Sequence, residues 1–152
     1  MEAILFVGIQ ASGKTSFYRE RFFRTHVRLS LDMLRTRHRE AILLHACIAA
    51  KQPFVIDNTN PTAAERTRYL VPAHAAGFQT IGYVFDVDMA ASLERNAARP
   101  ASERVPPKGI GGTRRRLEIP DLGEGFDQLY RVRIAGCGGF VVERWIDDAG
   151  CP

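Results

Sequence analysis

The sequence has little that would support a disulfide-rich, zinc-binding or membrane-spanning protein. It contains 3 cysteines, namely Cys47, Cys137 and Cys151, with no C-x-x-C pair and no histidine at the spacing of a zinc ligand. No apolar run approaches the roughly 18 to 20 residues of a transmembrane helix, and the apolar segment ending at Gly8 is too short and too acidic for a signal peptide. We therefore expect a cytoplasmic protein with no membrane partner.

Lysine is also scarce, because Lys14, Lys51 and Lys108 are the only lysines among 21 basic residues. Arginine suits bidentate phosphate recognition, but an arginine-rich composition also arises from genomic base bias. The net charge of +4 is ordinary for a soluble protein. With 45% hydrophobic and 25% charged residues in 152 positions, the chain has the size and composition of a single folded domain spanning residues 1–152.

Strand-like and helix-like segments alternate along the chain. Short apolar or alternating runs predict strands at residues 4–8, 26–29, 54–56, 80–85, 130–134 and 140–145, the last two forming a hairpin. Helices are predicted at residues 14–23, 32–50, 63–76 and 89–99. This alternation predicts an α/β fold with a mostly parallel sheet flanked by helices, whose ligands gather at the carboxyl ends of the strands.

The segment 100–120 differs from the rest, since it is rich in proline and glycine and contains the run Arg114-Arg115-Arg116. Its composition predicts an irregular or mobile stretch. Such a stretch could be a solvated surface loop, a flexible lid or a contact to nucleic acid. We assign residues 95–120 to a lid and flexible segment within the single domain.

One motif carries a specific chemical prediction. Residues 8–15, Gly8-Ile9-Gln10-Ala11-Ser12-Gly13-Lys14-Thr15, match G-x-x-x-x-G-K-[ST] between a predicted strand and a predicted helix. In this P-loop the glycines let backbone N–H groups turn toward a phosphate, the lysine reaches the β and γ phosphates, and the threonine hydroxyl ligates Mg²⁺. The loop and the following Ser16 are therefore predicted to bind ATP, with Mg²⁺ as the metal.

Two residues after the weak second strand are candidates for the acceptor side. Asp32 would lie at the ligand-binding edge of the sheet, where its carboxylate could take a proton from an attacking hydroxyl. Arg35 would share a helix face with Asp32 and could hold an anionic acceptor. The plainer alternatives are a helix N-cap for Asp32 and a simple ion pair for Arg35.

An acid is also needed near the metal. Asp57 ends the run 54–56 in the manner of the second-strand acid of P-loop enzymes, and Asp86 ends the run 80–85 and could compete for the same role. We prefer Asp57, because its strand is expected to lie beside the P-loop. A polar cap on a strand end is the alternative.

Arg95 and Arg99 are four residues apart on one predicted helix and therefore share a face. Neither has an acidic partner three or four residues away within that helix. They are either a solvated surface pair or a clamp on the transferring phosphoryl group.

Taken together, these motifs resemble the 5′-hydroxyl polynucleotide kinase domain of phage and bacterial end-healing enzymes, over nearly the whole chain. The matching pattern is the P-loop, Asp32-x-x-Arg35, Asp57-x-Thr59-Asn60 with Arg66, and Arg95-Asn96-x-x-Arg99 followed by Val105-Pro106. Gln10 departs from it, because such loops often have proline there.

The resemblance implies a P-loop kinase fold and transfer of the ATP γ-phosphate to the 5′-hydroxyl of a DNA or RNA end. It further implies that Asp32 is the general base, that Arg35 contacts the phosphate 3′ of the acceptor nucleotide, and that Arg95 and Arg99 contact the donor phosphates. Two other functions stay open. One is a small-molecule P-loop kinase for a sugar, nucleoside or antibiotic, and the other is a non-catalytic nucleotide-binding module.

Overall fold

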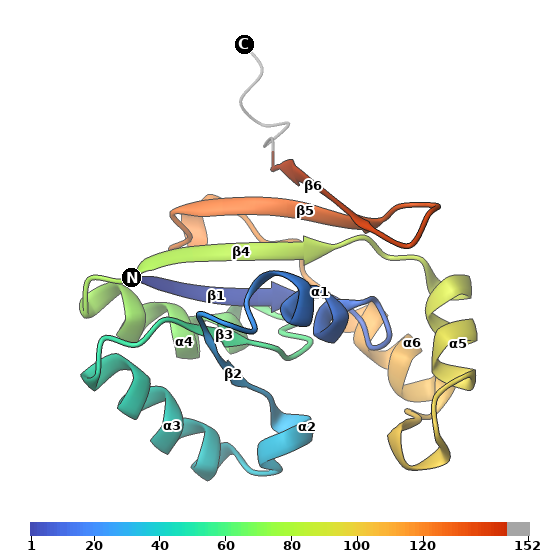
Figure 1. Cartoon of the computed structure of the whole chain (residues 1–152), viewed down its shortest axis with the longest axis horizontal. Coiled ribbons are helices and arrows are strands. Elements are labelled where there is room, and N and C mark those ends of the chain that lie inside the picture. Colours follow the sequence, from blue (N-terminus) through green and yellow to red (C-terminus); the bar gives the residue numbers. More distant parts are fainter. Residues whose placement is uncertain (146–152) are drawn as a thin grey trace.

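A single six-stranded sheet organises the computed structural model, which describes residues 1–145. The strand order is β2-β3-β1-β4-β5-β6, and every neighbouring pair is parallel except β5 with β6. Figure 1 shows β1 and β4 pointing toward the end of the molecule where α5 and α6 lie. The strands are β1 (Glu2–Val7), β2 (Val27–Leu29), β3 (Phe54–Ile56), β4 (Gln79–Phe85), β5 (Gln128–Ile134) and β6 (Phe140–Arg144).

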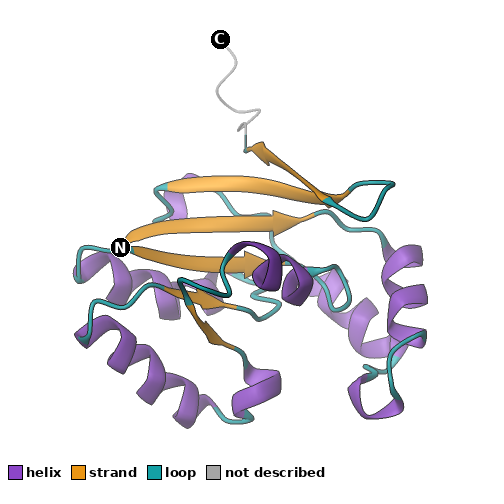
Figure 2. Cartoon of the chain, viewed as in Figure 1, coloured by secondary structure: helices purple, strands orange, loops and turns teal. Residues whose placement is uncertain are grey.

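Helices connect these strands (Figure 2). They are α1 (Lys14–Arg21), α2 (Leu31–Leu34), α3 (Arg37–Ala49), α4 (Ala63–Ala75), α5 (Met89–Ala97) and α6 (Pro107–Arg116), with short 3₁₀ turns η1 (Ala101–Glu103) and η2 (Leu122–Glu124). The predicted α/β fold with a mostly parallel sheet is confirmed. No helix within residues 1–145 is both long and apolar enough to cross a membrane.

The core lies on both faces of the central strand β1. Leu5 faces a cluster completed by α3 and α4, whereas Ile4 and Phe6 face a cluster completed by α1. Both faces are thus covered, which explains why the first strand is a continuous apolar run rather than an alternating one. The P-loop follows directly from this buried strand, so its position is set by the most rigid part of the sheet.

The helix predicted at 32–50 is broken in two. α2 ends at Leu34, Arg35 has a φ of 73°, and α3 begins after Thr36. The Thr36 hydroxyl accepts the backbone N–H of Arg39, so Thr36 is the N-cap of a new helix, a role that threonine favours. The prediction that Arg35 and Asp32 share one helix face is therefore wrong, because Arg35 lies beyond the end of α2.

The proline- and glycine-rich segment also differs from the sequence prediction, because α6 is a regular helix of 10 residues. Pro107 stands in its first turn, where the missing N–H costs nothing. Ile110 is fully buried, and a Cβ at Gly109 would lie 3.1 Å from Val105 Cγ1. Tertiary packing thus holds in helical form a segment whose composition opposes a helix.

Gly82 provides a test of how tightly β4 packs. A Cβ there would lie 2.6 Å from Leu129 Cδ2 and 2.8 Å from Phe126 Cε1. We predict that Gly82→Ala lowers the free energy of unfolding by about 1 to 3 kcal/mol because the core becomes overpacked, as measured by urea denaturation. Gly136→Ala is the matched control, since no heavy atom of the described residues lies within 4 Å of that position. Equal stability of the two variants would contradict this view of the core.

Candidate active site

The P-loop runs from the end of β1 to the first turn of α1, and two of its glycines are sterically required. A Cβ at Gly8 would lie 3.0 Å from Phe85 Cβ, and Gly13 adopts a left-handed φ of 95° as the N-cap of α1. The backbone N–H of Gly8 donates to Thr59 O at 3.0 Å. This bond ties the loop to the segment after β3, which carries the acid predicted to serve the metal.

Lys14 lies inside the loop with 8% of its surface exposed. Its ammonium donates to Gly8 O at 3.1 Å, to Ile9 O at 2.5 Å and to Ser12 Oγ at 3.4 Å. Burial lowers the pKa of Lys14 from 10.5 to about 8, while the charges of Asp57 and Asp32 raise it and that of Arg99 lowers it. The predicted base, metal acid and second lid arginine therefore all lie within electrostatic reach of the P-loop lysine.

The acid beside Thr15 is Asp57. The Thr15 hydroxyl donates to Asp57 Oδ2 at 3.0 Å, and Asp57 is 5% exposed. Asp86 instead follows β4, on the opposite side of β1 from β3, and accepts a hydrogen bond from Arg131 Nε at 2.6 Å. Of the two aspartates that the sequence left open, the geometry places Asp57 next to the threonine.

The residues around Thr15 fit a magnesium ion. A hydroxyl and a carboxylate are oxygen donors, and Mg²⁺ in phosphoryl-transfer sites is held by one or two protein oxygens together with the substrate phosphates. Across residues 1–145 no group of three or more His, Cys, Asp or Glu side chains could hold a metal without such help. Thr15 and Asp57 would hold Mg²⁺ here.

The hydroxyl of Ser30, at the end of β2, makes no hydrogen bond within residues 1–145. Ser30 is fully buried, and its Oγ has no hydrogen-bond partner among the described residues. The backbone of Ser30 is extended, so its side chain lies on the same face as that of Arg28. Because a buried polar atom normally has a partner, this hydroxyl is an unsatisfied group where β2 leads into α2.

The two acceptor-side candidates lie on α2 and at its end. Asp32 and Arg35 are both exposed, and Arg35 is the C-cap of α2. Ser30 stands at the N-cap position of this helix, although its hydroxyl makes no cap hydrogen bond, so Asp32 is not the N-cap. The carboxylate of Asp32 is therefore at the surface and near enough to Lys14 to raise its pKa.

A buried polar network, which the sequence reasoning missed, anchors α2. Asn58 Oδ1 accepts the backbone N–H of Leu31 at 2.9 Å, and Asn58 Nδ2 donates to Glu40 Oε2 at 2.9 Å. Tyr69 donates to Glu40 Oε1 at 2.8 Å. Burial, together with the charge of Glu40, raises the pKa of Tyr69 to about 12. A helix as short as α2 has little stability of its own, so its place depends on Asn58.

The lid arginines lie at the end of α5. Arg95 Nε donates to Ala11 O of the P-loop at 2.7 Å, so this side chain already reaches the loop. α5 ends at Ala97, and Arg99 follows the helix rather than lying on it. The prediction of one shared helix face is therefore wrong in detail, although Arg95 contacts the loop and Arg99 lowers the pKa of Lys14.

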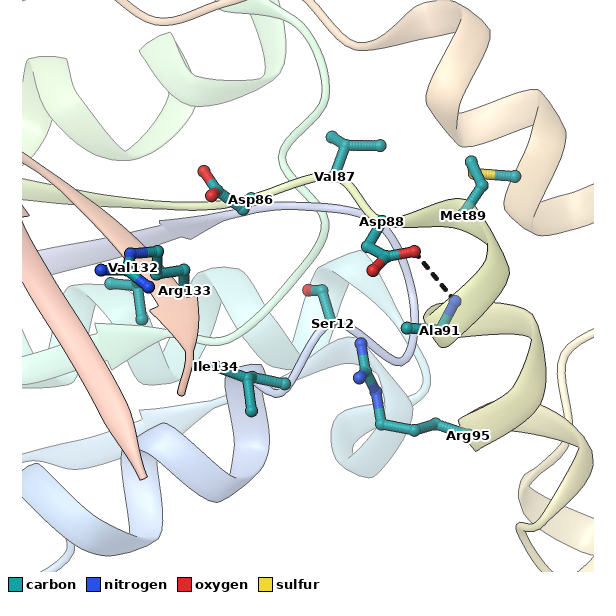
Figure 3. Close-up of a pocket in the computed structure, with 10 residues that line it drawn as sticks. All are labelled: Ser12, Asp86, Val87, Asp88, Met89, Ala91, Arg95, Val132, Arg133 and Ile134. Atoms are coloured by element: carbon teal, nitrogen blue, oxygen red, sulfur yellow. Dashed lines mark hydrogen bonds between the residues drawn. The ribbon is translucent and has the colours of Figure 1, made fainter. Parts of the chain in front are cut away.

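A pocket of about 650 Å³ opens beside the P-loop. Figure 3 shows Arg95 and Ser12 directed toward the same space, with the segment after β4 along one side. Asp88 caps α5 there by accepting the N–H of Ala91 at 3.0 Å. The pocket is lined by residues of the P-loop, of the β4–α5 segment and α5, and of the end of β5. These residues are Ser12, Asp86, Val87, Asp88, Met89, Ala91, Arg95, Val132, Arg133 and Ile134.

Two further residues of the sequence pattern have structural partners. Gln10, which stands where proline is common, donates from Nε2 to Thr113 Oγ1 at 2.9 Å and so links the P-loop to α6. Arg66 is fully buried and forms a two-pronged pair with Glu124, both distances being 2.8 Å. Arg66 therefore joins α4 to η2 and is not available to a substrate.

A family model described as an AAA domain matches residues 4–120. The chain belongs to the AAA domain family. Its fold is also found in solved structures of other proteins. Kti12 from Chaetomium thermophilum, in complex with ADP-AlF3, superposes with a TM-score of 0.65 at 16% identity, covering 90% of this chain and 92% of that one. A gluconokinase from Sinorhizobium meliloti 1021 gives 0.61 at 16% identity, covering 88% and 83%.

A third structure of this fold is from the PezAT toxin-antitoxin system of Streptococcus pneumoniae, with a TM-score of 0.64, 14% identity and coverage of 92% and 70%. At these identities the likeness concerns the fold. This AAA domain thus has the predicted P-loop kinase fold.

The pKa of Lys14 gives a testable pH dependence. Well below pH 8 most Lys14 side chains are already charged ammonium groups. Above about pH 8 most are neutral amines, which must gain a proton before they can pair with a phosphate. We predict that ADP binding near pH 8.5 takes up a fraction of a proton, and that ADP affinity falls as the pH rises from about 8 toward 10. The second phosphate ionisation lies near pH 6 and does not contribute.

Calorimetry in buffers of different ionisation enthalpy measures this uptake. Lys14→Met, if it retains weak binding, is the control and should show none. A wild-type binding enthalpy that does not depend on the buffer near pH 8.5 would show that Lys14 is already fully charged there.

The anchor of α2 can be tested without any assay of activity. Asn58→Leu removes the acceptor of the Leu31 N–H, so we predict at least about tenfold faster hydrogen exchange at Leu34 and Arg35. These amides donate to Ser30 O and Leu31 O, both at 2.8 Å. The amides of α4 serve as the internal control. Unchanged exchange in α2 would mean that other contacts hold the helix.

Proposed function

We propose that this AAA domain is an ATP-dependent kinase that phosphorylates the 5′-hydroxyl ends of DNA or RNA. The observation that carries the proposal is the placement of α2. This helix presents the exposed carboxylate of Asp32 within electrostatic reach of Lys14, and the exposed Arg35 follows as its C-cap. A base followed closely in the chain by an arginine suits a hydroxyl acceptor that carries its own phosphate.

The reaction would be an in-line displacement. The acceptor oxygen forms a bond to the γ-phosphorus while the bond from that phosphorus to the β,γ-bridging oxygen breaks, and ADP leaves. Asp32 accepts the hydroxyl proton. Mg²⁺, when bound by Thr15 and Asp57, neutralises charge on the β and γ phosphates.

The arginines and Lys14 would stabilise the charge that develops on the phosphoryl oxygens. Lys14 and Arg95 must then exchange their present partners for phosphate oxygens. Lys14 leaves Gly8 O and Ile9 O, and Arg95 leaves Ala11 O. Both side chains thus lie at the loop and need only local movements, while Arg99 completes the group from the segment that follows α5.

A kinase for a small hydroxylated molecule is the second candidate. A gluconokinase shares the fold, and Asp32 would serve as the base in either case. The two candidates differ in what they require of Arg35, because a neutral sugar or nucleoside has no phosphate for a guanidinium to hold. A nucleotide-binding module without catalysis is the third, and an intact Asp32 beside Lys14 speaks against it.

The deciding experiment incubates labelled ATP and Mg²⁺ with 5′-hydroxyl DNA and RNA oligonucleotides, a nucleoside 3′-monophosphate, the plain nucleoside and a panel of sugars. We expect Asp32→Asn to lower phosphorylation at least about a hundredfold, as loss of a general base does, with ADP binding retained. Asp121→Asn is the control, because Asp121 is also an exposed aspartate.

Arg35→Ala should erase most of the preference for the 3′-phosphorylated acceptor. Loss of a charge-assisted contact lowers kcat/KM about tenfold or more. Arg24→Ala, at another exposed arginine, should keep the preference. Rapid phosphorylation of a sugar, with no preference for the 3′-phosphate in the wild-type protein, would favour the small-molecule kinase instead.

A further inference from the structure

Arg28 is a cation that the sequence analysis did not assign. It lies on the edge strand β2, and its side chain is 23% exposed while that of its partner Asp57 is 3% exposed. Arg28 Nε donates to Asp57 Oδ2 at 2.8 Å, and Arg28 Nη2 donates to Thr15 Oγ1 at 3.4 Å. One guanidinium therefore contacts both residues that would hold Mg²⁺.

The direction of the hydrogen bonds makes this contact significant. The Thr15 hydroxyl gives its proton to Asp57, so its lone pairs remain, and one of them faces Arg28. A metal ion would use those same lone pairs, while the proton could stay on the bond to Asp57. The ligand pair is therefore already arranged for a cation, and the guanidinium takes the place of that cation.

The burial of Asp57 favours its ion pair with Arg28 when no metal is bound. Asp57 is almost fully buried, and a buried carboxylate without a partner is costly. The ammonium of Lys14 is directed instead at Gly8 O, Ile9 O and Ser12 Oγ. Arg28 is thus the charged partner of Asp57 among the described residues.

We propose that Arg28 is the resident cation of the nucleotide site, competing with Mg²⁺ for Asp57 and Thr15 and so setting how much Mg²⁺ the site requires. Without divalent metal it neutralises Asp57. When Mg²⁺ enters with a nucleotide, the guanidinium withdraws toward the solvent, to which the Arg28 side chain is already 23% exposed. The inference rests on the proposed nucleotide binding, but it concerns metal and nucleotide affinity rather than phosphoryl transfer.

Competition has a measurable consequence. In Arg28→Met the carbon stem is largely kept and the competing charge is lost. At a fixed ADP concentration, the Mg²⁺ concentration that gives half of the metal-dependent gain in ADP binding should fall about tenfold, the usual worth of one charge-assisted contact. Calorimetric titration of ADP at a series of Mg²⁺ concentrations, starting from EDTA, measures this midpoint.

The matched control is Arg116→Met, which removes an arginine that pairs with Glu65 at 3.0 Å between α6 and α4. Its Mg²⁺ midpoint should equal that of the wild-type protein. Thermal unfolding establishes that both variants are folded. An unchanged or higher midpoint in Arg28→Met would overturn the proposal.

A second measurement needs no variant. In the wild-type protein the Nε–H of Arg28 is bonded to Asp57, so its NMR signal should be protected from exchange in the free protein and with ADP in EDTA. Protection should be lost on adding Mg²⁺ with ADP. Retained protection with Mg²⁺ and ADP would overturn the proposal even if Arg28→Met failed to fold, and a wild-type protein that bound no ADP would overturn the proposed function together with it.

Discussion

The buried ammonium of Lys14 must have oxygen partners, and much of the site follows from that requirement. The P-loop backbone meets it by turning the carbonyls of Gly8 and Ile9 inward. The same turn brings Gly8 within reach of Thr59 and leaves no space for a Cβ at position 8. The loop, the end of β3 and the start of α1 are therefore one unit, and Thr15 and Asp57 meet within it.

A second consequence is electrostatic. Several cations converge on this edge of the sheet, and each has a protein oxygen as a partner. Lys14 and Arg95 are held by loop carbonyls, whereas Arg28 is held by a carboxylate. A nucleotide and its metal would replace these oxygens one by one, so binding is an exchange of partners rather than the filling of an empty space. The affinity of the site reflects the difference between the two sets of contacts.

The acceptor side is built differently. α2 is too short to be stable alone, and its anchor is Asn58, which follows the metal acid Asp57 in the chain. The network continues to Glu40 and Tyr69 in the helices beneath. One short segment, Asp57-Asn58, thus supplies both the acid beside Thr15 and the support for the helix that carries Asp32. Two adjacent residues therefore tie the position of Asp32 to that of the P-loop threonine.

The sequence by itself determined the α/β alternation, the P-loop and the two strand-end acids Asp57 and Asp86, because these are local patterns of apolar runs, glycines and strand ends. Only the tertiary structure placed Asp57 rather than Asp86 beside Thr15. It also decided the break at Arg35, the helical state of α6 and the partners of Arg28, Asn58 and Gln10. Arg28 lies on β2, and Asp57 directly follows the neighbouring strand β3, 29 residues further along the chain. Such pairs depend on strand order and on how far each strand runs, and hydrophobic periodicity carries no information about either. Packing likewise overrode local preference where Ile110 is buried in a helix rich in glycine.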